Sequence, residues 1–110
     1  MFIEVPGSRR TPEWQRGQIA ISSGDCVMFA CLGDQEGETT ITLGRSLEFR
    51  DLGAPMCEVA IGAPADKLLL MTMTGNQVAE VPVSGRAFQV RFWVEEPDHP
   101  ARVTIGIDPR

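Results

Sequence analysis

Residues 80–96 read EVPVSGRAFQVRFWVEE, and apolar and polar residues alternate along this stretch on both sides of Ser84-Gly85. Alternation with a period of two is typical of a β-strand that buries one face and exposes the other. Glycine accepts the backbone angles of a tight turn. The stretch therefore predicts a hairpin. Its second strand should bury Phe88, Val90, Phe92 and Val94 and turn Gln89, Arg91, Trp93 and Glu95 to the polar face.

The same pattern recurs along the chain, between turns predicted at Ser23-Gly24-Asp25, Gly75-Asn76 and Pro97-Asp98-His99-Pro100. Helical signals are confined to the segment that starts at Thr11-Pro12, where a cap and a first-turn proline precede Gly17. Repeated short strands of this kind predict an all-β fold, an antiparallel, jelly-roll-like β-sandwich of about eight to ten strands in one domain over residues 1–110. The expected strands are 2–5, 18–22, 26–32, 38–43, a short piece at 47–49, 57–61, 67–74, 78–83, 86–95 and 103–107.

Composition narrows the classes of protein that fit. The chain has 110 residues, 43% of them hydrophobic, and a net charge of −5. That apolar content is too high for a disordered chain, and the acidic balance argues against a nucleic-acid binder, which needs a basic stripe. No apolar run approaches the roughly 20 residues that span a membrane, and the start of the chain lacks a secretory signal pattern. We therefore expect a cytoplasmic protein.

Residues suited to catalysis are few. His99 is the only histidine, it stands between two prolines, and no metal-binding spacing surrounds it. The cysteines are odd in number and share no redox or zinc spacing, so they are expected to be reduced and buried. No phosphate-binding glycine motif occurs. We expect no enzyme activity, metal or cofactor; a Cys57 nucleophile paired with His99 is the enzymatic alternative.

Acidic residues gather in two stretches, GDQEGE at 33–38 and EEPD at 95–98. The first lacks the glycine pattern and terminal glutamate of a calcium loop, so an acidic hairpin loop is expected instead. Trp93 either packs on a neighbouring strand or stacks with an arginine, such as a cross-strand partner of Arg91, or it anchors a partner, since tryptophan is enriched in binding hot spots. The predicted partner-binding residues of this group are Asp34, Glu36, Glu38, Trp93, Glu95, Glu96 and Asp98.

Two segments, 26–32 and 68–73, are apolar on both strand faces. A loop, or the segment around Trp14, could cover the second face. Alternatively, the second segment forms part of a partner surface, because flexible thioethers adapt to irregular contacts and exposed apolar patches mark interaction sites. Leu69, Met71 and Met73 are the residues of that second hypothesis, which is also compatible with a homodimer.

The strand 78–85, VAEVPVSG, followed by 88–93, FQVRFW, resembles the C-terminal signature of the competence protein J family. In those small bacterial proteins a strand ends in a Leu-Pro-x-Gly-like turn and the next, aromatic strand ends in tryptophan. Here Arg86-Ala87 place the first aromatic one residue later than usual in the family. The order of the remaining elements is also similar, over 18–22, 27–29, 57–61 and 68–73.

The resemblance implies a β-sandwich inhibitor or immunity-type protein that binds and masks a nuclease. An acidic inhibitor would be steered to the basic, phosphate-binding surface of such an enzyme. We therefore expect a non-enzymatic binding protein whose partner is another, basic protein. The alternative is a β-sandwich module that binds a small ligand or carbohydrate, although the aromatic content of 6% is low for such a site.

Overall fold

A computed structural model describes residues 1–7, 18–30, 39–72, 75–95 and 100–110. These residues form an all-β sandwich of two packed sheets, which confirms the predicted fold class. The elements are β1 (Phe2–Glu4), β2 (Ala20–Ser23), β3 (Cys26–Phe29), β4 (Thr40–Gly44), the 3-10 helix η1 (Ser46–Leu52), β5 (Cys57–Ile61), β6 (Ala65–Met71), β7 (Gln77–Gly85), β8 (Phe88–Val94) and β9 (Arg102–Pro109).

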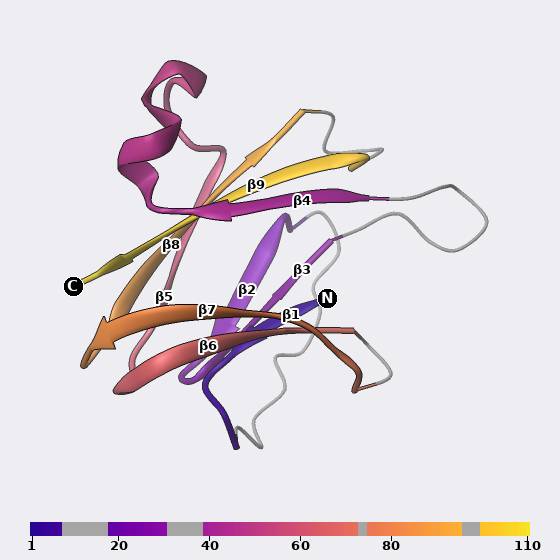
Figure 1. Cartoon of the computed structure of the whole chain (residues 1–110). Coiled ribbons are helices and arrows are strands. Elements are labelled where there is room, and N and C mark those ends of the chain that lie inside the picture. Colours follow the sequence, from indigo (N-terminus) through magenta and orange to yellow (C-terminus); the bar gives the residue numbers. More distant parts are fainter. Residues whose placement is uncertain (8–17, 31–38, 73–74, 96–99) are drawn as a thin grey trace.

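The five-stranded sheet has the order β2-β3-β1-β6-β7, and the four-stranded sheet has the order β4-β9-β8-β5. Figure 1 shows β4, β9 and β8 in one layer and β1, β6 and β7 in the other. Neighbouring strands are antiparallel except β4 and β9, which run parallel with Thr40 opposite Arg102. This parallel pair, between segments about 60 residues apart, brings together two distant parts of the chain.

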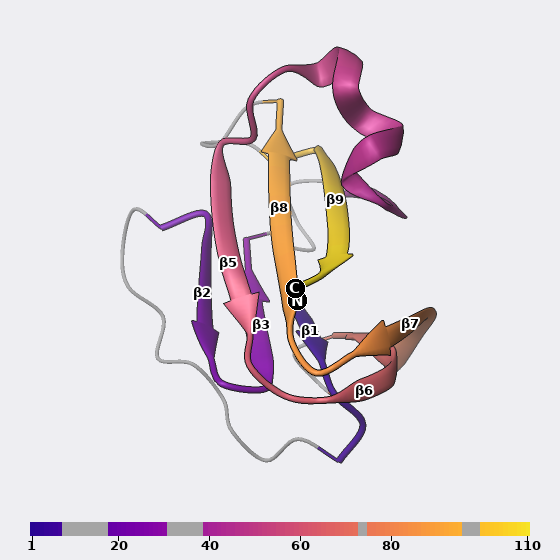
Figure 2. The same cartoon turned by 90° about the vertical axis from the view of Figure 1, so that its left-hand side faces the viewer.

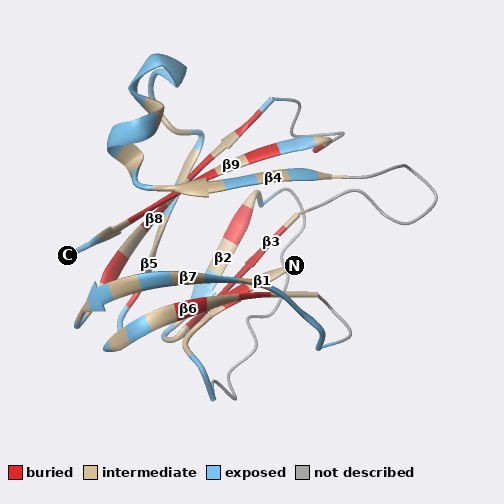
Figure 3. Cartoon of the chain, in the orientation of Figure 1, coloured by how far each residue is buried: buried red, intermediate tan, exposed pale blue. Residues whose placement is uncertain are grey.

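The core lies between the sheets and is made by the inward residues of every strand (Figure 3). Phe88, Val90 and Phe92 of β8 are fully buried, as the alternation predicts, while Arg91 and Trp93 point outward. The rings of Phe29 and Phe92 meet across the sandwich with centroids 5.4 Å apart. Each such side chain contributes about 1.5–3 kcal/mol on burial, so this apolar layer is the main stabilising element of the fold.

The predicted hairpin around Ser84-Gly85 is wrong. β7 pairs with β6 in one sheet and β8 pairs with β5 and β9 in the other, so the chain crosses between sheets at Arg86-Ala87. In Figure 1 the chain leaves β7 at the left and turns up into β8. The glycine at 85 lacks the positive φ of a tight hairpin turn. Two alternating strands can bury their apolar faces side by side or across a sandwich, and the pattern is the same in both cases.

Two other predicted turns are confirmed, at Gly24 and Gly75, whereas residues 97–99 of the third lie outside the described ranges. Gly24, with φ 67°, joins β2 to β3, whose residues Ser23 and Cys26 are directly paired. Gly75, with φ 88°, lies in the connection from β6 to β7, where its amide donates to the carbonyl of Thr72 over 3.0 Å. Both positions need a left-handed backbone, which glycine adopts without steric cost.

The short strand expected at 47–49 is instead part of η1, in which Leu47 is 65% exposed. Phe49 has φ −115°, so η1 consists of two short turns on either side of a kink, and Gly53 ends it with φ 77°. Figure 2 shows η1 near one end of β8 and β9. Within the described residues there is no helix with the length and apolar character that crossing a membrane requires.

Candidate partner-binding surfaces

The structure separates the predicted binding residues onto opposite outer faces of the sandwich. Trp93 and Glu95 belong to the outer face of the four-stranded sheet, whereas Leu69 and Met71 lie on that of the five-stranded sheet. A single flat partner surface therefore cannot contact both groups. The other predicted residues lie outside the described ranges, and these are Asp34, Glu36, Glu38, Met73, Glu96 and Asp98, together with His99, Cys31 and Trp14.

The two acidic stretches of the sequence join the sheet side by side. Residues 33–38 lead to Thr39, and residues 95–98 lead to Pro100. Thr39 donates its hydroxyl to the carbonyl of Pro100 over 3.0 Å, and the amide of Thr40 donates to the carbonyl of Ala101 over 2.8 Å. Because β4 and β9 are parallel, both strands begin at the same end of the sheet, where the exposed Glu95 also lies.

Trp93 packs on η1 and lies over Gly106 of the neighbouring strand β9, and its role as a partner anchor stays a prediction. Its indole Nε1 donates to the carbonyl of Gly53 over 3.1 Å, and its ring lies 5.8 Å from that of Phe49. Beneath it, a Cβ placed on Gly106 would come within 3.1 Å of the indole. Trp93 therefore holds η1 and the residue that ends it against the sheet, and only part of its surface remains available to a partner.

η1 can approach the sheet because two glycines lie beneath it. Gly44 of β4 and Gly106 of β9 are register partners. A Cβ on Gly106 would lie 2.9 Å from the Cα of Ser46, and one on Gly44 would lie 3.0 Å from the ring of Phe49. A side chain on Gly106 would therefore meet the backbone of η1, whereas one on Gly44 would meet the side chains of Glu48 and Phe49. Glycine is used here for close approach rather than for an unusual backbone angle.

Arg91 is the centre of a polar network beside this glycine pair. Its Nε donates to Glu58 over 3.0 Å, and its Nη1 donates to Asp108 over 2.8 Å and to the hydroxyl of Ser46 over 3.2 Å. Arg45 donates to the same Asp108 over 3.2 Å. Strands β5, β8 and β9 and the start of η1 are therefore tied together by charge-assisted hydrogen bonds, which are stronger than neutral ones.

Asp108 is held in its charged form by these contacts. Partial burial alone would raise its pKa, but the hydrogen bonds from Ser46 and Arg45 and the charge of Arg91 outweigh it, so the pKa lies below its usual value. The backbone amide of Ser46 also donates to the carboxylate over 3.3 Å. Asp108 thus fixes the first residue of η1 to the end of β9.

Sequence reasoning missed most of this network. Parity predicted that Arg91 points outward, but Arg45, Ser46, Glu58 and Asp108 were not recognised. The available signal was a set of opposite charges on outward positions of strands that are far apart in sequence. Because the strand order was unknown, nothing indicated that Glu58 lies opposite Arg91 or that Asp108 lies diagonal to it.

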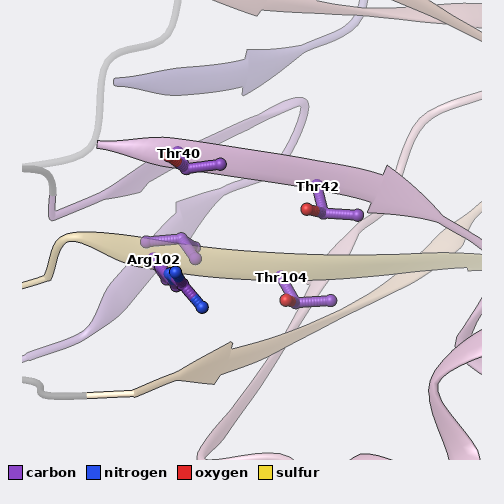
Figure 4. A pocket seen from close by; sticks show the side chains of 5 residues that line it. Thr40, Thr42, Arg102 and Thr104 are labelled. Atoms are coloured by element: carbon purple, nitrogen blue, oxygen red, sulfur yellow. The ribbon is translucent and has the colours of Figure 1, made fainter. Parts of the chain in front are cut away.

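A hollow of about 300 Å³ lies on β4 and β9, next to the end where the acidic stretches join the sheet. In Figure 4 the side chains of Thr40, Thr42, Thr104 and Arg102 gather along these two strands. Thr42 is opposite Thr104, which is in turn opposite Trp93, so hydroxyls and an indole occupy one row across three strands. Arg102 is largely exposed, and its Nε lies 3.9 Å from Glu95.

The outer face of the five-stranded sheet is apolar in part, over β2, β3, β1 and the end of β6, whereas Lys67 and Glu80 form an ion pair between β6 and β7. Ile21, Met28, Phe2 and Met71 form a register row across β2, β3, β1 and β6. Leu69 lies in the next row, opposite Glu4. All but Met28, which is 7% exposed, are half-buried, and none belongs to the core between the sheets. The second, outward-facing row of apolar side chains in these segments is therefore only partly accessible to solvent. The proposed cover around Trp14 lies outside the described residues.

The described thiols are poorly suited to nucleophilic catalysis. Burial, reinforced by Glu4 and Asp25, raises the pKa of Cys26 to about 12. Burial also raises the pKa of Cys57. A thiol is nucleophilic as the thiolate, so both groups are protonated and slow to react at neutral pH. Among the described residues, no group of three or more histidine, cysteine, aspartate or glutamate side chains is arranged to hold a metal ion.

Comparisons with protein families, curated proteins and solved structures found no match for this chain.

Proposed function

We propose that this protein is a non-enzymatic binding protein that masks a basic protein partner, such as a nuclease, with the acidic end of its four-stranded sheet. The observation that carries the proposal is the parallel pairing of β4 and β9, because it joins the stretches containing Asp34, Glu36, Glu38 and Glu95, Glu96, Asp98 to adjacent strands at one end. A concentration of carboxylates at one end would steer a basic partner to that end.

The net charge of −5 also supports binding to a basic partner. The raised pKa values of Cys26 and Cys57 argue against the thiol nucleophile of the enzymatic alternative. Trp93 contributes on this proposal mainly by keeping η1 in place, and its exposed edge is available to the partner beside Glu95.

The test is affinity capture on immobilised protein from extracts of its own source cells, at low and high salt. We expect one basic protein that binds at low salt and is released at high salt, since exposed charge pairs are screened by ions. The triple variant Glu95→Lys, Glu96→Lys, Asp98→Lys should lose that protein. The matched control reverses the same number of charges elsewhere, at Asp51, Asp66 and Glu80, and should retain it. Capture that is indifferent to the first variant, or to salt, would contradict the proposal.

A second candidate function rests on the hollow over β4 and β9, where threonine hydroxyls, Arg102 and Trp93 are neighbours. Hydroxyl and guanidinium groups beside an indole suit a carbohydrate, which hydrogen-bonds along its edges and stacks on aromatic rings. A thermal-shift screen with neutral and acidic saccharides tests it. A shift abolished by Thr104→Val would favour this function over protein masking.

A further inference from the structure

The sandwich has four edge strands among the described residues, and β4 is the longest of them without a charge, a proline or a register shift. β7 contains Pro82 and an irregular register near Met71, both of which hinder pairing with a further strand. β5 carries the ion-paired Glu58 and contacts the edge strand β2 across the sandwich. β4 reads Thr-Ile-Thr-Leu-Gly and has no charge, proline or register shift. Natural edge strands usually carry such protection against association, and β4 lacks it.

The backbone of β4 also has groups that face away from its neighbour. The hydrogen bond from the amide of Thr40 to the carbonyl of Ala101 fixes which backbone groups face β9. The amides and carbonyls of Thr40, Thr42 and Gly44 point toward that strand. Ile41 and Leu43 therefore direct their amide and carbonyl groups to the open edge. In the described part of the chain, no hydrogen bond reaches these groups from outside the sheet.

We propose that β4 pairs with β4 of a second copy of this chain, in antiparallel orientation about a two-fold axis at Thr42. In this register Ile41 lies opposite Leu43 of the second copy, and Leu43 lies opposite Ile41. Residues directly opposite in such a pair exchange both of their hydrogen bonds. Every edge-facing amide and carbonyl of the two residues is then satisfied in both copies, and the two four-stranded sheets become continuous.

The side chains of β4 fit the same register. Ile41 and Leu43 are half-buried and packed against the core, so each gains an apolar neighbour on the inner side of the joined sheet. Thr42 is exposed on the outer side and faces its own counterpart, a favourable cross-strand pair. A shift by one residue would place apolar side chains opposite exposed threonines, so the pattern selects this register.

Charge is compatible with self-pairing at β4 and at the shorter strand β2, but not at β5 or β7. β4 brings no like charges together, whereas β5 and β7 would each place a glutamate near its counterpart. Arg45, whose side chain is 62% exposed, would lie opposite Thr39 of the second copy, the residue that follows Glu38 in the sequence. A contact this short buries less than the roughly 1,200 Å² of a stable interface, so the dimer should be weak and concentration-dependent.

Sedimentation equilibrium on the purified protein over about 10 μM to 1 mM tests the proposal. We expect the average mass to rise toward that of a dimer, and more so at high salt, because screening reduces the repulsion between two chains of charge −5. Masking of a basic partner has the opposite salt dependence, so failure of one proposal is distinguishable from failure of the other. Thr42→Lys should abolish the rise, whereas Ser84→Lys adds the same charge to edge strand β7 and should leave it unchanged.

Oxidative cross-linking provides an independent readout of the register. Opposite residues in a non-hydrogen-bonded antiparallel pair are close enough for a disulfide. Thr42→Cys should therefore form linked dimers faster than the wild-type protein, and Thr104→Cys, on the same face but on the inner strand β9, should not. A monomer at every concentration, or equal linking of the two cysteine variants, would overturn the proposal and leave the β4 edge to a strand from a different protein.

Discussion

The outer faces of the two sheets differ in how they are stabilised. On the four-stranded sheet, polar side chains from β5, β8 and β9 pair with one another around Arg91, and η1 packs on Gly44 and Gly106. On the five-stranded sheet, Phe2, Met28 and Met71 form an apolar row. The first face is held mainly by specific hydrogen bonds. The second is held mainly by removal of apolar surface from water, with one exposed ion pair between Lys67 and Glu80.

This difference changes how each face treats a carboxylate. Asp108 on the polar face receives hydrogen bonds from Ser46 and Arg45, and its pKa is lowered. Glu4 on the apolar face is partly buried beside Asp25, and its pKa is raised, with the Cys26 thiol only partly offsetting this. A charge is stabilised where donors are built around it and costs free energy where burial and a like charge outweigh the available donors.

The largest effect is expected at the glycine pair. Gly106→Ala should destabilise the protein by about 1–3 kcal/mol, because the new methyl group would meet Ser46 and Trp93 at distances that force η1 to move. Urea unfolding measures the loss. The matched control is Gly62→Ala, where an added Cβ meets nothing within 4 Å and φ is not in the left-handed range, so the change should stay within about 0.5 kcal/mol. Equal losses in the two variants would show that η1 does not depend on the close approach.

Removal of the central cation should have the next largest effect. Arg91→Met leaves Glu58 and Asp108 without their shared partner and should cost about 1–2 kcal/mol. Arg102→Met removes a charge of the same sign from an exposed pair with 3.9 Å separation, and should cost less than about 0.5 kcal/mol. If the two arginine variants were equally stable, the network would be a surface feature without structural importance.

The dependence of stability on pH should show the contribution of Asp108 on the polar face. Because the pKa of folded Asp108 is lowered, its contribution to stability is present above the unfolded pKa and disappears as the pH falls through the folded value. Denaturation profiles from pH 7 to pH 2 should show this loss below about pH 4, and Asp108→Asn should flatten that part of the profile. If Asp108→Asn lost as much stability at acid pH as the wild-type protein does, the loss would come from other carboxylates.

The smallest effect, and one of opposite sign, is expected at Glu4. A raised folded pKa means that the charged form is disfavoured by folding, so Glu4→Gln should stabilise the protein at neutral pH, by up to about 0.5 kcal/mol. The gain should vanish at low pH, where Glu4 is protonated in both states. A loss of stability at pH 7 would instead indicate that the carboxylate makes a favourable contact on the apolar face.

The sequence by itself determined the fold class, most strand positions and the buried face of the strands whose apolar and polar residues alternate. Alternation predicted that Phe88, Val90 and Phe92 are buried and that Trp93 points outward, because a strand turns successive side chains to opposite faces. Gly24 and Gly75 predicted their turns because few other residues adopt a positive φ. These properties depend on local geometry, which neighbouring residues specify.

Only the tertiary structure decided which strands are neighbours. Alternation is the same whether β7 and β8 pair or face each other across the core, so the predicted hairpin could not be distinguished from a crossing between sheets. The parallel pairing of β4 and β9, the network around Arg91 and the packing of η1 on Gly44 and Gly106 all depend on that choice. Strand order is set by how all the apolar faces pack together at once, and no single stretch of sequence carries that information.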